Sequence, residues 1–258
     1  MKRKITTKFQ LFFTDVDGTL ITDNNVISDP VKNAIKRFKD NILIIPVTAR
    51  SYQSATILLK PLCLHSHTIV EAGAKIVDSY GKIIWVRYVS KKILQRIIKF
   101  LIDQKILYSF CIGGKTVEVT NQKILLTLDL NQVTRISLLN LTERQIKKIN
   151  IFLTSIYGIV FYKIKNRINN KYWNIDITSR NANKKKAVLL LKKLLHIKKE
   201  SIVAVGDGYN DIDFIKEAGY KIAMGNAVDD LKTIADYIAP SAYQNGFVNV
   251  INKIIKYE

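Results

Sequence analysis

Residues 10–24 read QLFFTDVDGTLITDN, and this stretch decides the fold. Its apolar beginning is typical of a buried β-strand, which stops at two acids two positions apart, Asp15 and Asp17, followed by a Gly-Thr turn. Carboxylates at the end of a core strand cost folding free energy unless a positive charge lies beside them. The stretch therefore predicts a strand whose carboxyl end carries a charged site.

Strand and helix patterns alternate from this stretch to about residue 80. The continuously apolar segment 42–48 is typical of a strand buried on both faces. Such alternation predicts a parallel sheet with helices on both sides. The segments are, in chain order, QLFFTDV (10–16), SDPVKNAIKRFKDN (28–41), ILIIPVT (42–48), SYQSATILLKPL (51–62) and HTIVEAGA (67–74).

The rhythm changes near residue 80 and returns near residue 184. Between them, short strands and two helical stretches (91–104 and 142–156) follow a hairpin pattern around Gly81, which predicts an antiparallel sheet with helices. We therefore predict an α/β core formed by residues 1–80 and 180–258, interrupted by an inserted α+β domain at 81–179.

Composition is that of a globular protein. The chain has 258 residues, 48% of them hydrophobic and 24% charged, enough for a core and a smaller second domain. Two cysteines give no disulfide framework, and no apolar run reaches the roughly 18 residues of a membrane span. We expect a cytoplasmic protein with no membrane partner.

The formal net charge of +20 is unusual. A basic chain can bind nucleic acid or an anionic membrane. Here the densest lysine runs, at 89–100 and 183–200, alternate with apolar residues at helical spacing, as solvated helix faces do. We do not expect nucleic acid as the main partner, and a small anionic substrate suits the same charge.

Polar residues collect where the predicted parallel strands end. In such sheets, sites form outside the carboxyl ends of the strands. Carboxylates and a hydroxyl would converge there, and the mutual repulsion of the acids and their oxygen-only character favour Mg²⁺ with phosphate as a further ligand. One of the lysines at 184–186 could reach the same anion. The residues are Asp15, Asp17, Thr48, Asp207, Asn210 and Asp211.

The paired acids suggest a chemistry. A carboxylate beside Mg²⁺ can attack phosphorus and form an aspartyl-phosphate. A second carboxylate two residues on lies on the same side of an extended strand, where it can protonate the leaving alkoxide and later activate water. The metal and a lysine would neutralise charge on the transferring phosphoryl group.

Four motifs resemble those of the haloacid dehalogenase (HAD) superfamily. They are DVDGTL (15–20), VTAR (47–50), KKKAV (184–188) and GDGYNDIDF (206–214). Three further segments, VEAGAKI (70–76), AMGNA (223–227) and ADYIAPSAYQNG (235–246), resemble the Cof-type phosphatases of that superfamily, which carry a C2B cap. The resemblance implies a HAD-like Rossmannoid parallel sheet with an inserted α+β cap.

The resemblance also implies residue roles. Asp15 would be the nucleophile and a metal ligand, and Asp17 the general acid/base that also offers its carbonyl to Mg²⁺. Thr48 and Lys184 would bind the phosphoryl oxygens, and Arg50 would be structural or near the substrate. Asp207 would be a metal ligand, Asp211 a ligand or its support, and Asn210 would orient the phosphate.

Two positions depart from the family pattern. The usual Lys-Gly-x-Ala is Lys184-Lys185-Lys186-Ala187 here, so alignment selects Lys184 while Lys185 and Lys186 stay open. The usual Asn-Gly-Ala is Ala72-Gly73-Ala74, which removes an amide from the substrate side.

The predicted function is a Mg²⁺-dependent phosphatase acting on a small phosphorylated metabolite, a sugar phosphate, as a monomer or homodimer. A phosphomutase or sugar-phosphate phosphotransferase would use the same aspartyl-phosphate. An inactive, basic nucleic-acid-binding relative is the alternative from another class. In the insert, which would close over the site as a lid, Asp176 and Arg180 are candidates for substrate choice.

Overall fold

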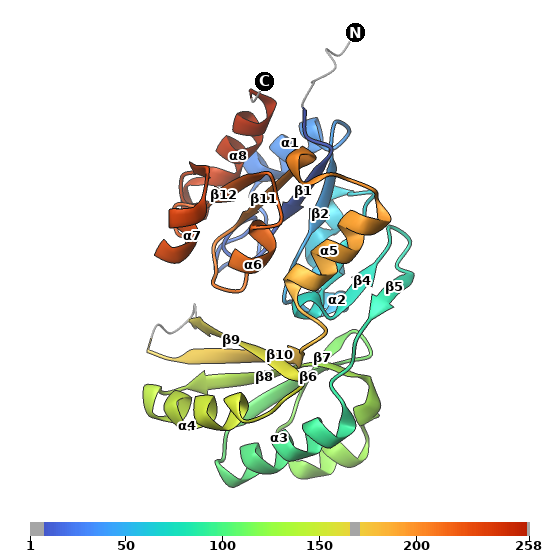
Figure 1. The fold of residues 1–258 in the computed structure, drawn as a ribbon, viewed down its shortest axis with the longest axis vertical. Coiled ribbons are helices and arrows are strands. Elements are labelled where there is room, and N and C mark those ends of the chain that lie inside the picture. The colour runs from blue at the N-terminus through green and yellow to red at the C-terminus, as the bar shows by residue number, and fades with distance from the viewer. Residues whose placement is uncertain (1–7, 166–170, 257–258) are drawn as a thin grey trace.

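Three sheets organise the chain, whose structure is a computed structural model describing residues 8–165 and 171–256. A central sheet with its helices forms one body, and a second sheet with two helices forms another beside it (Figure 1). A small three-stranded sheet lies in the segment where the chain leaves the first body for the second (Figure 1). In the described part of the chain, no helix combines the length and apolar character needed to cross a lipid bilayer.

The central sheet has the order β13-β12-β11-β1-β2, and every neighbouring pair is parallel. This confirms the parallel α/β core predicted from the alternating segments. A single parallel bridge, between Val47 and Ile69, continues the sheet beyond β2. The strands are β1 (Leu11–Thr14), β2 (Leu43–Pro46), β11 (Ile202–Gly206), β12 (Tyr220–Ala223) and β13 (Tyr237–Ile238).

Helices cover both faces of the central sheet because successive strand residues point to opposite sides. Phe12 packs with α1 (Asp29–Phe38) and α8 (Gly246–Ile255), whereas Leu11 and Phe13 pack with α5 (Lys184–Leu194) and α6 (Ile212–Ile215). The remaining helices of this body are α2 (Tyr52–Leu59), α7 (Asp229–Ile234) and the short 3₁₀ helices η1 (Lys60–Leu62), η2 (Glu71–Gly73), η5 (Lys199–Ser201) and η6 (Ala242–Gln244).

The three-stranded sheet is antiparallel, in the order β3-β4-β5. It consists of β3 (Thr68–Val70), β4 (Lys75–Val77) and β5 (Ile83–Val86), so the hairpin expected around Gly81 is present. The strand expected over 67–74 ends early, at Val70, because the next three residues form η2 and have positive φ angles of 57°, 57° and 89°. Residues 83–86, which we predicted in the insert, pair with β4.

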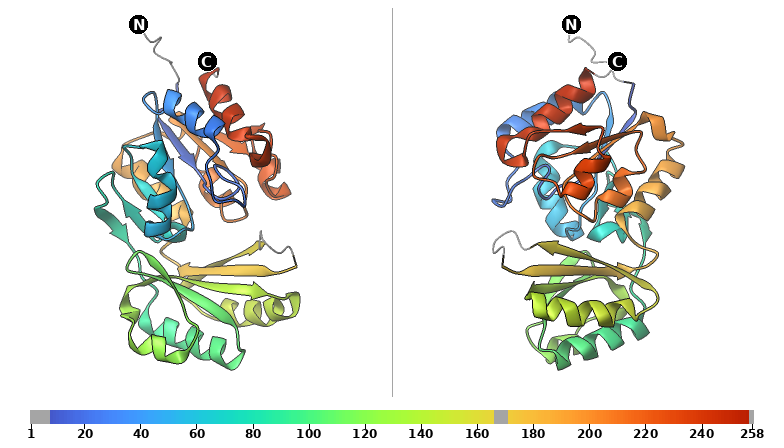
Figure 2. Two further views of the ribbon diagram at one scale, coloured as in Figure 1. Left: turned by 180° about the vertical axis from the view of Figure 1, so that it is seen from behind. Right: turned by 60° about the vertical axis from the view of Figure 1, so that its left-hand side comes forward.

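The second body contains an antiparallel sheet, here called the cap sheet, in the order β7-β6-β8-β10-β9. Helices α3 (Lys91–Asp103) and α4 (Glu143–Thr154) cover the side of it that is turned away from the central sheet (Figures 1 and 2). The strands and short helices are β6 (Leu107–Ile112), β7 (Lys115–Glu118), η3 (Gln122–Leu126), η4 (Leu130–Gln132), β8 (Val133–Leu141), β9 (Ile159–Lys165) and β10 (Trp173–Ser179).

The two faces of the cap sheet differ in polarity. Ile136, Leu138 and Ile175 belong to the apolar cluster shared with α3 and α4. Their neighbours along β8 and β10, which alternate to the other face, are polar: Arg135, Ser137, Asn174 and Asp176. The polar face therefore looks toward the central sheet.

A buried carboxylate, that of Glu71, joins the two bodies. The Glu71 carboxylate, which has no exposed surface, lies 2.8 Å from Lys75 Nζ and accepts a hydrogen bond of 2.5 Å from Thr134 Oγ1 on β8. The backbone of Gln53 on α2 also donates to Gly114 O, before β7 (2.9 Å). These contacts fix β8 of the cap sheet against the core.

Close packing beside this pair makes Gly73 a sensitive position. Its φ is +89°, and a Cβ there would lie 2.2 Å from the carbonyl carbon of Asn183, which precedes α5. We expect Gly73→Ala to lower the free energy of unfolding by about 3 kcal/mol. Alanine disfavours this backbone conformation, and its Cβ would clash with the backbone of Asn183. Urea denaturation measures the change.

Gly113→Ala is the matched control. Gly113 also has a positive φ, +56°, but nothing lies within 4 Å of its added Cβ. Only the conformational cost of about 1–2 kcal/mol should remain there. Equal costs at the two glycines would show that the approach to Asn183 is unimportant.

Candidate active site

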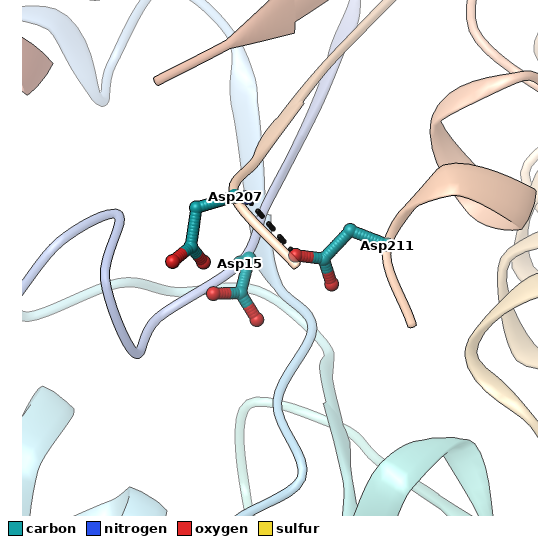
Figure 3. Close-up of side chains that lie close together, drawn as sticks. All are labelled: Asp15, Asp207 and Asp211. Carbon is teal, nitrogen blue, oxygen red and sulfur yellow. Dashed lines mark hydrogen bonds between the residues drawn. The ribbon is translucent and has the colours of Figure 1, made fainter. Parts of the chain in front are cut away.

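Three carboxylates gather at the carboxyl ends of β1 and β11. Asp15 follows β1, and Asp207 and Asp211 follow β11. One ligand oxygen from each lies within 4.8 Å of those of the others. Figure 3 shows them around one point, with a hydrogen bond from the Asp207 backbone to Asp211. The convergence predicted from the strand ends is therefore present for these three acids.

Lys184 provides the positive charge between two of these acids. It is the first residue of α5, and its Nζ lies 2.6 Å from both Asp15 Oδ1 and Asp211 Oδ1. The other two candidate lysines point elsewhere. Lys185 Nζ lies 3.3 Å from Glu217 Oε1, and Lys186 Nζ donates a hydrogen bond to Asn181 Oδ1. Of the three, the structure brings Lys184 into the site.

Asp211 holds the loop after β11 in place. Its Oδ2 accepts hydrogen bonds from the backbone amides of Asp207 (3.1 Å) and Gly208 (2.9 Å), while its Oδ1 faces Lys184. A side chain on Gly206 would lie 2.7 Å from the same Oδ2. Because both oxygens of Asp211 are in use, its geometry fits the support of Asp207 and Lys184 better than direct ligation.

Burial and a neighbouring negative charge shift the pKa of Asp15, the candidate nucleophile. Burial, and then the nearby charge of Asp211, raise the pKa of Asp15 to about 7, with Lys184 opposing the shift. Burial lowers the pKa of Lys184, but the charges of Asp15 and Asp211 outweigh it and leave that pKa raised. The lysine therefore stays charged at neutral pH, while Asp15 holds a proton more tightly than an ordinary aspartate.

Asp17 is bound by residues from the end of β2. Arg50 donates from Nε and Nη2 to its carboxylate, with Nη2 2.7 Å from Oδ1. Thr48 Oγ1 donates to Asp17 Oδ2 at 3.3 Å and accepts from the Arg50 amide. Thr48 has no exposed surface, so in this structure it contacts Asp17 from inside the core.

A cavity of about 480 Å³ opens beside these groups and is lined by both bodies. This volume is typical of small-molecule sites. From the core, its lining includes Asp15, Asp17, Arg50, Lys184, Asp207 and Asn210. From the cap sheet, it includes Thr116, Arg135, Ile164 and Asn174.

The donor set fits a divalent cation. Three carboxylates gather beside Lys184, whose single ammonium group pairs with two of them, which leaves negative charge that a cation would balance. All the candidate ligand atoms are oxygens, the type that Mg²⁺ prefers, and no histidine or cysteine belongs to the group that the described residues form. Of the three clustered carboxylates, Asp15 and Asp207 line the cavity.

Asn226 connects the loops that carry these acids through hydrogen bonds. No role was assigned to this residue from the sequence. Its Nδ2 donates to the carbonyl of Gly18 (2.9 Å) and to Asp207 Oδ2 (3.3 Å). Its Oδ1 accepts from the Ala242 amide at 2.8 Å. The signal available was its position in the AMGNA motif, after β12 and at the same edge of the sheet.

Comparison with known proteins identifies the family. The family model described as haloacid dehalogenase-like hydrolase matches residues 12–251. The chain belongs to this family. The resemblance seen in the four motifs is confirmed, and so is the predicted fold.

Two full-length relatives of this HAD chain are named phosphatases. Phosphatase YwpJ of Bacillus subtilis is 25% identical, covering 95% of this chain and 100% of its own. The 5-amino-6-(5-phospho-D-ribitylamino)uracil phosphatase YcsE of the same organism is 29% identical, covering 94% of each. They confirm the predicted enzyme class, a hydrolase of phosphoric monoesters.

A solved structure shows the same fold. A haloacid dehalogenase-like hydrolase from B. subtilis superposes with a TM-score of 0.81 at 22% identity, over 95% of this chain and 99% of that one. The match spans both bodies, because it covers nearly the whole length of each chain.

The raised pKa of Asp15 predicts a pH-dependent stability. In the metal-free protein, the folded state holds this proton up to about pH 7, whereas the unfolded chain releases it near pH 4. The free energy of unfolding should therefore fall as pH rises through this interval. We expect the melting temperature in EDTA to fall more steeply for the wild type than for Asp15→Asn between pH 5 and 8. Parallel profiles would contradict this assignment.

Proposed function

We propose that this HAD phosphatase is Mg²⁺-dependent and hydrolyses a sugar phosphate or a similarly small phosphorylated metabolite through an aspartyl-phosphate. The observation that carries the proposal is the position of Asp15. Its carboxylate lines a cavity of about 480 Å³, beside Asp207 and 2.6 Å from Lys184. The groups that would serve as nucleophile, metal ligands and phosphoryl-binding cation are thus close together, which supports the proposal.

In the first step, a carboxylate oxygen of Asp15 attacks phosphorus. The Asp15 oxygen–phosphorus bond forms while the bond from phosphorus to the ester oxygen breaks, and Asp17 gives its proton to the leaving alkoxide. Arg50 donates a hydrogen bond to Asp17, and both residues line the same cavity. Lys184 balances charge on the phosphoryl oxygens.

In the second step, water hydrolyses the aspartyl-phosphate. Asp17, now ionised, takes a proton from that water, whose oxygen bonds to phosphorus as the Asp15 oxygen–phosphorus bond breaks. The chain then regains its initial protonation state and releases inorganic phosphate. Mg²⁺, held by Asp15, Asp207 and the carbonyl of Asp17, would supply electrostatic stabilisation of the transferring group.

The remaining predicted residues have supporting roles in this proposal. Asn210 lines the cavity and would orient the phosphate, and Thr48 would bind a phosphoryl oxygen when it releases Asp17. Asp211 keeps Lys184 and Asp207 in position. The insert at 81–179 would act as the lid, since its sheet turns a polar face to the cavity.

Small polar metabolites suit this site. The relative YcsE is named for an ester whose phosphate sits on a ribityl chain, a sugar-like group. The cavity offers an amide, a hydroxyl and a guanidinium from the cap sheet, which suits a hydroxylated leaving group.

Replacing the nucleophile tests the proposal. We expect Asp15→Asn to lower kcat/KM for phosphate esters at least about 10³-fold, because the attacking oxygen is lost. Asp103→Asn, an exposed acid on α3, should leave it unchanged. Phosphate release from an ester panel with Mg²⁺ measures both. Retained turnover in Asp15→Asn would remove the mechanism.

Removing the metal tests the cofactor. We expect EDTA to abolish turnover and added Mg²⁺ to restore it. Mg²⁺ should also raise the melting temperature of the wild type but much less that of Asp207→Asn, because binding to the folded state alone stabilises it. A wild type that turns over fully in EDTA would contradict the metal site.

A further inference from the structure

A buried ion pair lies on the polar face of the cap sheet, outside the catalytic cluster. Arg135 Nη1 on β8 donates to both carboxylate oxygens of Asp176 on β10, each at 3.0 Å. Ser137 Oγ donates to the same Asp176 at 2.5 Å. The side chains of Arg135 and Asp176 are only 11% and 8% exposed, so the ion pair is largely buried and is not a contact on the protein surface.

Only one of the three guanidinium nitrogens of Arg135 makes hydrogen bonds to the described residues. All side-chain hydrogen bonds of Arg135 within residues 8–165 and 171–256 run through Nη1. Its Nε is buried without a partner in that part of the chain. An arginine has five N–H donors, and buried donors without acceptors cost free energy. Nη2 also has no acceptor among the described residues, but unlike Nε it is not buried, so it can donate to an acceptor that enters from outside.

The place from which an acceptor can come is the catalytic cavity. Arg135 lines it together with Asn174, across from Asp15 and Lys184 of the core. Asn174 accepts from the Asn140 amide through Oδ1 at 3.0 Å, and its Nδ2 donates to none of the described residues. A phosphate held at Asp15 would direct the rest of the ester toward these two side chains.

The charges of the residues that line the cavity indicate which kind of leaving group, the part of the ester other than its phosphate, would bind there. Among the cap residues that line the cavity, Arg135 carries the charge, and Asp176 already balances it. A second anionic group of the substrate placed against these described cap residues would meet no unbalanced cation. Hydroxyl and carbonyl oxygens accept hydrogen bonds without needing one.

We propose that Arg135 and Asn174 form the subsite for the leaving group, that Asp176 is the positioning residue of Arg135, and that the subsite selects uncharged, hydroxyl-rich groups over carboxylate-bearing ones. This rests on the proposed phosphatase function. Asp176 fixes the guanidinium through Nη1, Nε is buried, and Nη2 is left to donate to substrate oxygens. Selectivity then comes from the cap sheet, while the core performs the same chemistry on every ester.

Three esters test the subsite. Glucitol 6-phosphate carries a hydroxylated leaving group, phosphoglycolate carries a carboxylate, and p-nitrophenyl phosphate offers no hydroxyl. We expect the wild type to prefer glucitol 6-phosphate to phosphoglycolate in kcat/KM. Arg135→Met and Asn174→Leu should each lower kcat/KM for glucitol 6-phosphate about 10- to 100-fold, and change that for p-nitrophenyl phosphate by less than about 3-fold. Preference for phosphoglycolate in the wild type would overturn the proposal.

Arg135→Met leaves the Asp176 charge buried and unpaired, which can impair folding. The double variant Arg135→Met/Asp176→Leu removes both charges and keeps the volume, so it should fold and still lose the preference for glucitol 6-phosphate. Asp176→Asn should raise KM for that ester more than it lowers kcat, and Arg135→Lys should recover part of the preference. A double variant that keeps the preference would overturn the subsite.

The same panel separates this proposal from the function on which it rests. If the wild type hydrolyses none of the three esters with Mg²⁺, the proposed function fails. If it hydrolyses them and Arg135→Met lowers all three equally, the function stands and the subsite is wrong.

Discussion

One ammonium group between buried acids governs the catalytic half of the molecule. Lys184 Nζ lies 2.6 Å from Asp15 and from Asp211, and burying these charges is favourable only with such close pairing. The surrounding backbone is shaped to permit it. Gly73 lets the chain before α5 approach within contact distance, and Gly206 leaves room for the Asp211 carboxylate. The strained segment at 71–73 therefore serves the position of one lysine.

The cap sheet is attached at the same place. The three left-handed residues that begin with Glu71 also turn its carboxylate toward Thr134, the residue before Arg135 on β8. The contact that fixes the cap sheet against the core thus ends one residue from a side chain lining the catalytic cavity. The acid cluster and the cap side of the cavity therefore share one anchor.

The sequence predicted the features that depend on local pattern. Asp15 and Asp207 follow apolar strands, so strand ends alone place them together. Long-range contacts could not be predicted in this way. Nothing in the sequence around Thr48 indicates that its hydroxyl contacts Asp17. Arg135 and Asp176 are 41 positions apart, and their pairing depends on the register of β8 and β10. The third strand ended early because Glu71 adopts a conformation that its residue type does not predict.

Global and local charge act at different ranges in this protein. The chain carries a formal +20, yet the catalytic cluster holds three carboxylates and one ammonium group, which contacts two of them. At physiological ionic strength, charges farther than about 8 Å apart in solvent are largely screened. The exposed lysines can therefore favour the approach of an anionic ester, but they cannot neutralise the buried acids. That balance has to come from groups inside the site, which is why a cation with oxygen ligands fits a protein that is otherwise strongly basic.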